Sequence, residues 1–189
     1  GETALKEVAS RHPEDNEAAQ LAIATEIAMG ALRYFLLKFT RNTVIALDFQ
    51  EALSFEGETG PYAQYSAVRS RSIFRKLEER GETIPDFRGV LSAEAMRRQL
   101  ATDELWQILV SAAKVDTVVE RAVAAGEPAH VAKYVFQLAQ TFNLFYHQYP
   151  VLAEPDPERK VFLLWLNGYL ADQLERTLAV LGIAVPAYM

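Results

Sequence analysis

The chain has 189 residues, half of them (50%) hydrophobic, which is enough for one large or two small domains with a real core. Its formal net charge of −6 argues against bulk, non-specific binding of nucleic acid but allows a local basic patch. The sequence contains no cysteine, which excludes a disulfide framework and a thiolate zinc site and fits a reducing compartment.

Residues 14–39 predict the first long helix, because Ala, Leu, Ile and Met dominate this stretch. Its apolar residues would lie on nearly every side of the helix. A helix of that kind is usually buried between neighbours. Arg33 and Lys38 interrupt the apolar run, and polar residues also interrupt the last apolar segment, so we expect no membrane span. There is no sign of a signal peptide, and a start at Gly1 instead of Met suggests a processed chain or an expression fragment.

The next segment, residues 43–49, favours a β conformation but is too short to build a sheet. The stretch "FEGETGPYAQYSAVRSRS" (55–72) then begins a helix: Thr59 or Gly60 can cap it, and Pro61 suits its first position. We expect this helix to run to Arg80, where Gly81 stops it.

A loop over residues 81–89 is followed by a helix that begins at Ser92, with a break or bend near residues 114–116. Gly126 and Pro128 separate it from the next helix, in which one broad apolar stripe recurs at a spacing of three to four. That stripe is Val131, Tyr134, Val135, Leu138, Ala139, Phe142, Phe145 and Tyr149.

The final helix carries a leucine stripe and, beside it, an aromatic face of Phe162, Trp165 and Tyr169. Gly182 closes this helix, and "IAVPAYM" forms a short tail. The leucines are Leu163, Leu166, Leu170, Leu174, Leu178 and Leu181. The fold class predicted from these patterns is all-α, a helical bundle.

Residues that could carry catalysis do not gather in any recognisable pattern. The three histidines, His12, His130 and His147, share no i, i+4 spacing and have no cysteine nearby, so we expect no metal site. "EGETG" lacks both the lysine of a phosphate-binding loop and the dinucleotide spacing, and no sequence pattern pairs a serine with a histidine.

An aromatic and basic surface remains. On a helix that begins at Pro61, Tyr62, Tyr65 and Arg69 share one face, and further basic residues follow within the same acidic chain. Aromatic rings stack on unpaired bases and guanidinium groups pair with phosphates, so this composition suits single-stranded RNA. The alternative is that the tyrosines pack in the bundle and the arginines are merely solvated.

Four blocks of the sequence resemble arginyl-tRNA synthetases, in the order and at the spacing of that family. The stretch quoted above from residues 55–72, extended to "FEGETGPYAQYSAVRSRSI", is similar to the junction between the catalytic core and the anticodon-binding domain. The other three resemble the end of the catalytic domain, the Phe-Asn-rich helix end and the chain terminus. They are "AMGALRYFLLKFTRNTVIALDF", "FNLFYHQYPVL" and "LAVLGIAVPAYM".

The resemblance implies that this chain is the C-terminal portion of such an enzyme, because the two class I catalytic signatures are absent. Residues 1–50 would be the tail of the catalytic region, a helix plus a short extended segment. Residues 51–189 would be the all-helical anticodon-binding (DALR) domain. The whole enzyme ligates arginine to tRNA with ATP and magnesium, whereas this chain alone is expected to be inactive and to hold no cofactor or metal.

The resemblance also implies contacts with the anticodon stem and loop of the tRNA for arginine. The implied tRNA-binding residues are Tyr62, Gln64, Tyr65, Arg69, Tyr146 and Met189. Phe142 and Phe145 are assigned to the core, and Val68 and Arg71 depart from the typical family pattern. The resemblance further implies that the chain is a cytoplasmic monomer and that neither DNA nor a membrane is its partner. The alternative is a helical interaction or structural protein that descends from such a domain without binding tRNA.

Overall fold

The computed structural model describes residues 5, 9 and 16–189, and the regular secondary structure of this part of the chain is entirely helical, as predicted. His12 and the first two residues of the predicted helix over 14–39 lie outside the described residues. The long helices are α2 (Glu17–Leu37), α4 (Gly60–Glu79), α9 (Ala129–Gln148) and α10 (Pro157–Val180). The shorter ones are α3 (Phe49–Ala52), α5 (Phe87–Val90), α6 (Ala93–Gln99), α7 (Asp103–Ala112), α8 (Val115–Ala125) and the 3-10 turn η1 (Val151–Ala153).

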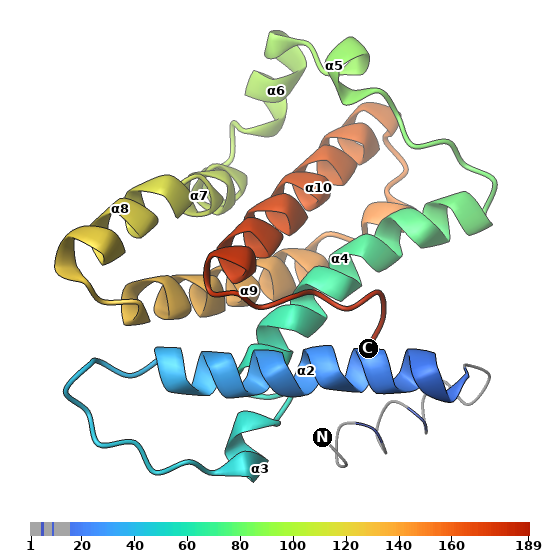
Figure 1. The fold of residues 1–189 in the computed structure, drawn as a ribbon. Coiled ribbons are helices and arrows are strands. Elements are labelled where there is room, and N and C mark those ends of the chain that lie inside the picture. The colour runs from blue at the N-terminus through green and yellow to red at the C-terminus, as the bar shows by residue number, and fades with distance from the viewer. Residues whose placement is uncertain (1–4, 6–8, 10–15) are drawn as a thin grey trace.

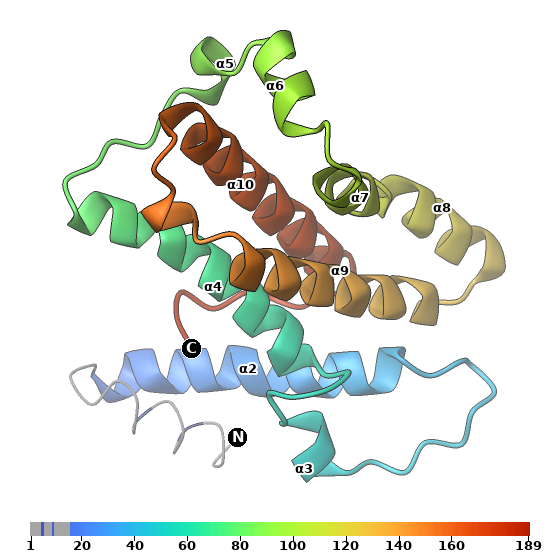
Figure 2. The same cartoon turned by 180° about the vertical axis from the view of Figure 1, so that it is seen from behind.

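Helices α4, α9 and α10 pack against one another and form the centre of the bundle (Figure 1). Helix α7 packs on α9 and α10, and α8 packs on α9. Helix α2 runs across one end of the bundle, where it contacts α4 and α9, whereas α5 and α6 lie at the opposite end (Figures 1 and 2). The C-terminal residues cross α4 and end beside α2.

The two predicted stripes form the core. Leu138, Phe142 and Phe145 of α9 are at most 1% exposed, and every member of the leucine stripe of α10 is buried. Tyr149 is the one member of the α9 stripe that is only half-buried. The aromatic face of α10 is confirmed as well, since the Trp165 ring stacks on Tyr169 at a centroid distance of 5.8 Å.

Local signals set most helix ends where the sequence placed them. The Thr59 hydroxyl accepts a hydrogen bond from the Tyr62 backbone N–H at 3.2 Å, and Pro61 lies in the first turn of α4. Ser92 caps α6 in the same way. The predicted break near residues 114–116 is found between α7 and α8.

Two predictions between residues 81 and 112 were wrong. The expected loop over 81–89 contains the start of α5, because the Asp86 carboxylate accepts the Arg88 N–H and caps a short helix. The helix that begins at Ser92 ends at Gln99, and α7 begins only at Asp103. Thr102 has an extended backbone conformation that separates the two.

Helix α2 is less enclosed than its composition predicts. Leu21, Met29 and Leu36 are each more than 40% exposed, so one side of this helix has no covering within the described residues. The expectation that no segment is apolar enough to span a membrane was also wrong for this helix. By length and composition α2 passes that test, with a mean hydropathy of 1.2, although core helices pass it too and 39% of its most apolar window is buried here.

The buried side of α2 touches α4 at two glycines. A Cβ atom on Gly60 would lie 2.5 Å from the Gly30 carbonyl oxygen, so the backbones of the two helices meet directly there. One turn later on α2, the Tyr34 hydroxyl donates to the Ala132 carbonyl of α9 at 2.9 Å. These contacts join α2 to two of the three central helices, α4 and α9.

Substitutions at the centres of the two stripes test this description of the core. Leu138→Ala and Leu170→Ala should each lower the free energy of unfolding by about 2–5 kcal/mol, because each leaves a cavity in a close-packed interior. Urea denaturation of the two variants measures this. A loss below about 0.5 kcal/mol would mean that the helix faces are assigned wrongly.

Candidate nucleic-acid interface

The first turns of α4 present two tyrosines and an arginine at the surface. The cap by Thr59 and the fixed backbone of Pro61 begin the helix just before Tyr62. Tyr62, Tyr65 and Arg69 are all half-buried, with one side of each against the bundle. The helix therefore holds these side chains on a rigid element, as the sequence predicted, although they do not all meet.

The Arg69 guanidinium lies between two tyrosine rings that come from different helices. Its central carbon is 4.8 Å from the centroid of the Tyr65 ring on α4 and also 4.8 Å from that of Tyr146 on α9. Both contacts fall within the range of cation–π attraction. Tyr65 and Tyr146, which are far apart in the sequence, are thus brought to the same cation. The three groups form a stack that is open to solvent on part of its surface.

A polar network fixes the orientation of this guanidinium. Arg69 Nη1 donates to Asn143 Oδ1 at 3.0 Å, and Nη2 donates to the Tyr65 hydroxyl at 3.3 Å. The Asn143 amide in turn donates to Ser66 Oγ at 2.9 Å. Because these bonds hold the planar group in one orientation, less side-chain entropy is lost when its remaining N–H groups bind an anion.

The stack borders a surface hollow of about 260 Å³. Two further cations of α4, Arg75 and Lys76, lie on its wall and are exposed. The residues around this hollow are Tyr65, Val68, Arg69, Ser72, Arg75, Lys76, Tyr146, Tyr188 and Met189. Four of the six predicted tRNA-binding residues, Tyr65, Arg69, Tyr146 and Met189, therefore meet at one place.

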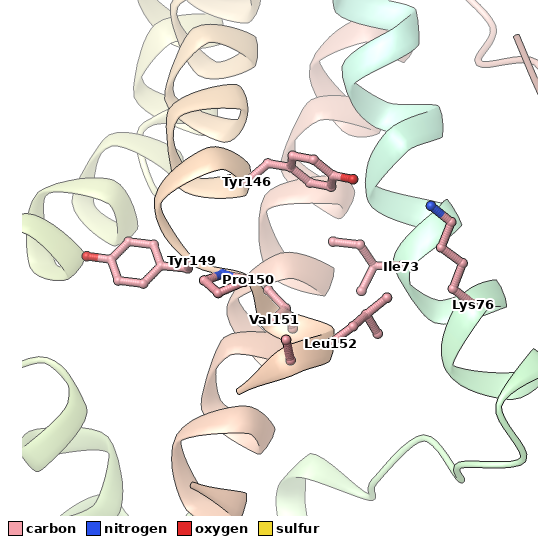
Figure 3. A pocket seen from close by; sticks show the side chains of 8 residues that line it. Ile73, Lys76, Tyr146, Tyr149, Pro150, Val151 and Leu152 are labelled. Carbon is pink, nitrogen blue, oxygen red and sulfur yellow. The ribbon is translucent and has the colours of Figure 1, made fainter. Parts of the chain in front are cut away.

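A second hollow of about 240 Å³ adjoins the first and shares Lys76 and Tyr146 with it (Figure 3). In this view the Tyr146 ring points from α9 towards α4, whereas Tyr149 points to the other side. The Tyr149 hydroxyl donates to the Glu104 carboxylate at 2.9 Å. Burial and this carboxylate raise the pKa of Tyr149 to about 12. The hydrogen bond to Glu104 turns the Tyr149 side chain to the far side of α9, so it borders the second hollow but not the first.

The other two predicted residues lie elsewhere. The Tyr62 ring packs against Phe136 of α9 with 5.5 Å between the ring centroids, and it does not line the hollow. The Gln64 side chain is fully buried and donates from Nε2 to the carbonyl oxygens of Glu26 and Ala184. This burial leaves Gln64 no surface for a direct contact with nucleic acid in this structure.

Sequence reasoning missed three residues of the site. Asn143 is one helical turn before Tyr146 in the same Phe-Asn block, and that spacing was a usable signal. Tyr188 directly precedes Met189, but nothing in the sequence shows that its ring reaches α4. Lys76 was noted only as part of the basic segment. In the part of the chain that the structure describes, no group of His, Cys, Asp and Glu could hold a metal ion.

Comparison with known proteins gives consistent matches. Residues 63–189 match the DALR anticodon binding domain family. The chain is 33% identical over 167 residues to the arginine–tRNA ligase of Parabacteroides distasonis, covering 88% of this chain and 27% of that protein. It is 32% identical over 187 residues to the arginine–tRNA ligase of Streptococcus suis, covering 98% of this chain and 30% of that protein.

Among solved structures, the arginyl-tRNA synthetase of Thermus thermophilus matches all (100%) of this chain with a TM-score of 0.80 and 28% sequence identity, over 30% of its own length. The arginyl-tRNA synthetase of Plasmodium falciparum, at 19% identity, shares the fold with a TM-score of 0.76. The chain thus spans less than a third of the length of the two curated relatives named above.

The position of Tyr65 at the surface can be tested by stability alone. Tyr65→Ala should lower the free energy of unfolding by about 1–2 kcal/mol, because it removes a partly solvated cation–π contact, the hydrogen bond from Arg69 and an edge-on contact with Phe55. Phe142→Ala, at a side chain that is 0% exposed, should cost about 3–5 kcal/mol. Urea denaturation compares the two; equal losses would show that Tyr65 is a core residue instead.

Proposed function

The chain belongs to the DALR anticodon-binding domain family, in the form that arginine–tRNA ligases carry, and from this premise we propose that it binds the anticodon arm of the tRNA for arginine. The observation that supports this most directly is the Tyr65–Arg69–Tyr146 stack beside the hollow that Met189 borders. It offers aromatic rings and an oriented cation at the same place, which is the chemistry that unstacked bases and phosphates need.

In the proposed complex the tyrosines contact bases and the basic side chains contact phosphates. Tyr65 and Tyr146 stack on bases of the anticodon loop, and Met189 gives the hollow an apolar contact for a base. Arg69, with Arg75 and Lys76 beside it, pairs with phosphates. Tyr62, which packs on α9, braces the start of α4 next to the anticodon stem.

The overall acidity of the chain does not oppose this proposal, because recognition depends on where the charge lies. The hollow has three cations of α4 on its wall, and none of the described residues that line it has a carboxylate side chain. Arg75 is 3.9 Å from Glu79, but both side chains are more than half exposed and such a pair is weak. Local positive potential on an acidic protein then favours a defined RNA over bulk polyanion binding.

The chain divides at about residue 50 in the proposed assignment. Residues 1–50 are the tail of the ligase's catalytic region, and residues 51–189 are the anticodon-binding domain. The family match begins only at residue 63, whereas the matches to ligases extend over as much as 98% of the chain, which supports a different origin for the first segment. The whole ligase joins arginine to its tRNA with ATP and magnesium.

The test is a titration of the 189-residue chain with the tRNA for arginine and with an unrelated tRNA, at several salt concentrations. The tRNA for arginine should bind more tightly than the unrelated tRNA. Tyr65→Ala should weaken binding by about 1–3 kcal/mol, the range for one stacked base, and Tyr65→Phe should keep most of the affinity as a matched control. Arg69→Met should reduce the slope of log K against log salt by about one.

Equal affinity for both tRNAs, with no effect of Tyr65→Ala, would contradict the proposal. That outcome would favour the alternative, a helical interaction or structural protein without tRNA binding, to which the net charge of −6 lends some weight.

Catalysis gives a separate prediction. Neither class I catalytic signature occurs in this sequence, so we expect no arginine-dependent exchange of pyrophosphate into ATP and no aminoacylation by this chain alone. Both assays are done on a preparation made in cells whose own ligase can be removed by a tag. Arginylation that persists after that removal would contradict the prediction.

A further inference from the structure

The C-terminal segment, residues 182–189, leaves α10 at a sharp turn. Gly182 has a positive φ of 68°, and the Gly182 and Ile183 N–H groups bond to the carbonyls of Ala179 and Leu178, both at 2.9 Å. This is the pattern of a Schellman motif, which ends a helix and redirects the chain. The segment forms no helix beyond this point, crosses α4 and ends beside α2 (Figures 1 and 2).

Three side chains from α2 and α4 hold this segment by alternate backbone carbonyls. Arg33 Nη1 of α2 donates to the Gly182 carbonyl oxygen. Gln64 Nε2 of α4 donates to that of Ala184 at 2.7 Å, and Arg71 Nη1 donates to that of Pro186 at 3.4 Å. The segment is neither helix nor strand here, so these three side-chain donors satisfy carbonyls that no regular backbone ladder reaches.

The end of the segment lies between α2 and the hollow. Tyr188 and Met189 pack against a small apolar cluster of α2, formed by Ile23, Ala24 and Ile27. The same two residues border the hollow next to the Tyr65–Arg69–Tyr146 stack. The segment therefore supplies one wall of the hollow, and its placement depends on contacts with α2.

We propose that Arg33, Gln64 and Arg71 are positioning residues for RNA binding, which act by holding the C-terminal segment so that Tyr188 and Met189 complete the hollow. This inference rests on the proposed function. Arg33 lies before residue 63, outside the part of the chain that matches the anticodon-binding family, and so does Glu26, whose carbonyl also accepts from Gln64 at 3.2 Å. Helix α2 is then part of the machinery that shapes the RNA-binding surface.

Holding the segment in place matters because a chain end has high conformational entropy. An untethered terminal segment samples many conformations, and ordering it on binding lowers the affinity. Donors that hold three carbonyls in the free protein remove this cost before the RNA arrives. Loss of one donor should therefore weaken RNA binding by about three- to tenfold, the size of one net hydrogen bond, without a direct contact between that donor and the RNA.

The test uses Arg33→Met, because Arg33 is exposed and its loss should leave the melting temperature close to that of the unaltered chain. Carboxypeptidase should release Met189 and Tyr188 faster from this variant, and its affinity for the tRNA for arginine should fall as stated. Arg33→Lys, which keeps a donor, should restore part of the affinity for tRNA and part of the resistance to carboxypeptidase. In a chain without residues 187–189, Arg33→Met should cause no further loss of affinity, since the wall it positions is gone.

Matched variants separate this effect from charge. Arg97→Met removes the same charge from an exposed residue of α6, at the far end of the bundle. It should leave the carboxypeptidase release rate unchanged, and it should lower the tRNA affinity only by the small non-specific effect of losing one positive charge. Arg71→Met should behave like Arg33→Met. Glu175→Gln, which breaks the 2.6 Å ion pair of Arg71 but not its bond to Pro186, should leave carboxypeptidase release unchanged.

Two results would overturn the inference: an unchanged release rate in Arg33→Met, or an equal loss of affinity in the full and the shortened chains. The release rate is measured without RNA. If the unaltered chain fails to discriminate between tRNAs, the proposed function fails and the positioning role for RNA falls with it, while the release rate still reports whether the segment is held.

Discussion

The arrangement of the site depends on the direct contact of α2 and α4 at Gly30 and Gly60. A methyl group on Gly60 would lie 2.5 Å from the Gly30 carbonyl oxygen, and one on Gly30 would lie 2.6 Å from the Gln64 amide nitrogen. Only two glycines allow the helices to approach so closely. Gln64 can then donate both to the Glu26 carbonyl of α2 and to the Ala184 carbonyl of the C-terminal segment. Arg33, one turn beyond Gly30, comes within reach of Gly182.

The packing of α4 against α9 explains how an acidic chain can present a cationic site. Arg69 is not simply a solvated charge, because two rings and the Asn143 amide fix it where two helices meet. An arginine held this way keeps its full charge and has lost much of its rotamer freedom already, so an anion gains a specific partner at low entropic cost. The other charges of α4 contribute potential, but the stack determines the geometry.

The sequence predicted those features that depend on neighbours along the chain. The cap by Thr59 and the leucine stripe of α10 were right because capping and helical periodicity act within a few residues. The start of α5 at Asp86 was missed, although its signal was equally local. The fully buried Gln64 and the exposed face of α2 could not be predicted, because both depend on which segments, far apart in the sequence, pack against each other.

The packed bundle therefore extends beyond the segment that matches the family, because it includes α2. The match begins at residue 63, yet the Tyr34 hydroxyl of α2 reaches the Ala132 carbonyl of α9, and α2 contacts the C-terminal segment through Arg33. Since Met189 packs on α2 and borders the hollow, a movement of α2 relative to α4 would change the wall of the proposed RNA-binding surface. A helix outside the matched domain thus helps to shape a surface inside it, through packing and hydrogen bonds that the described residues already make.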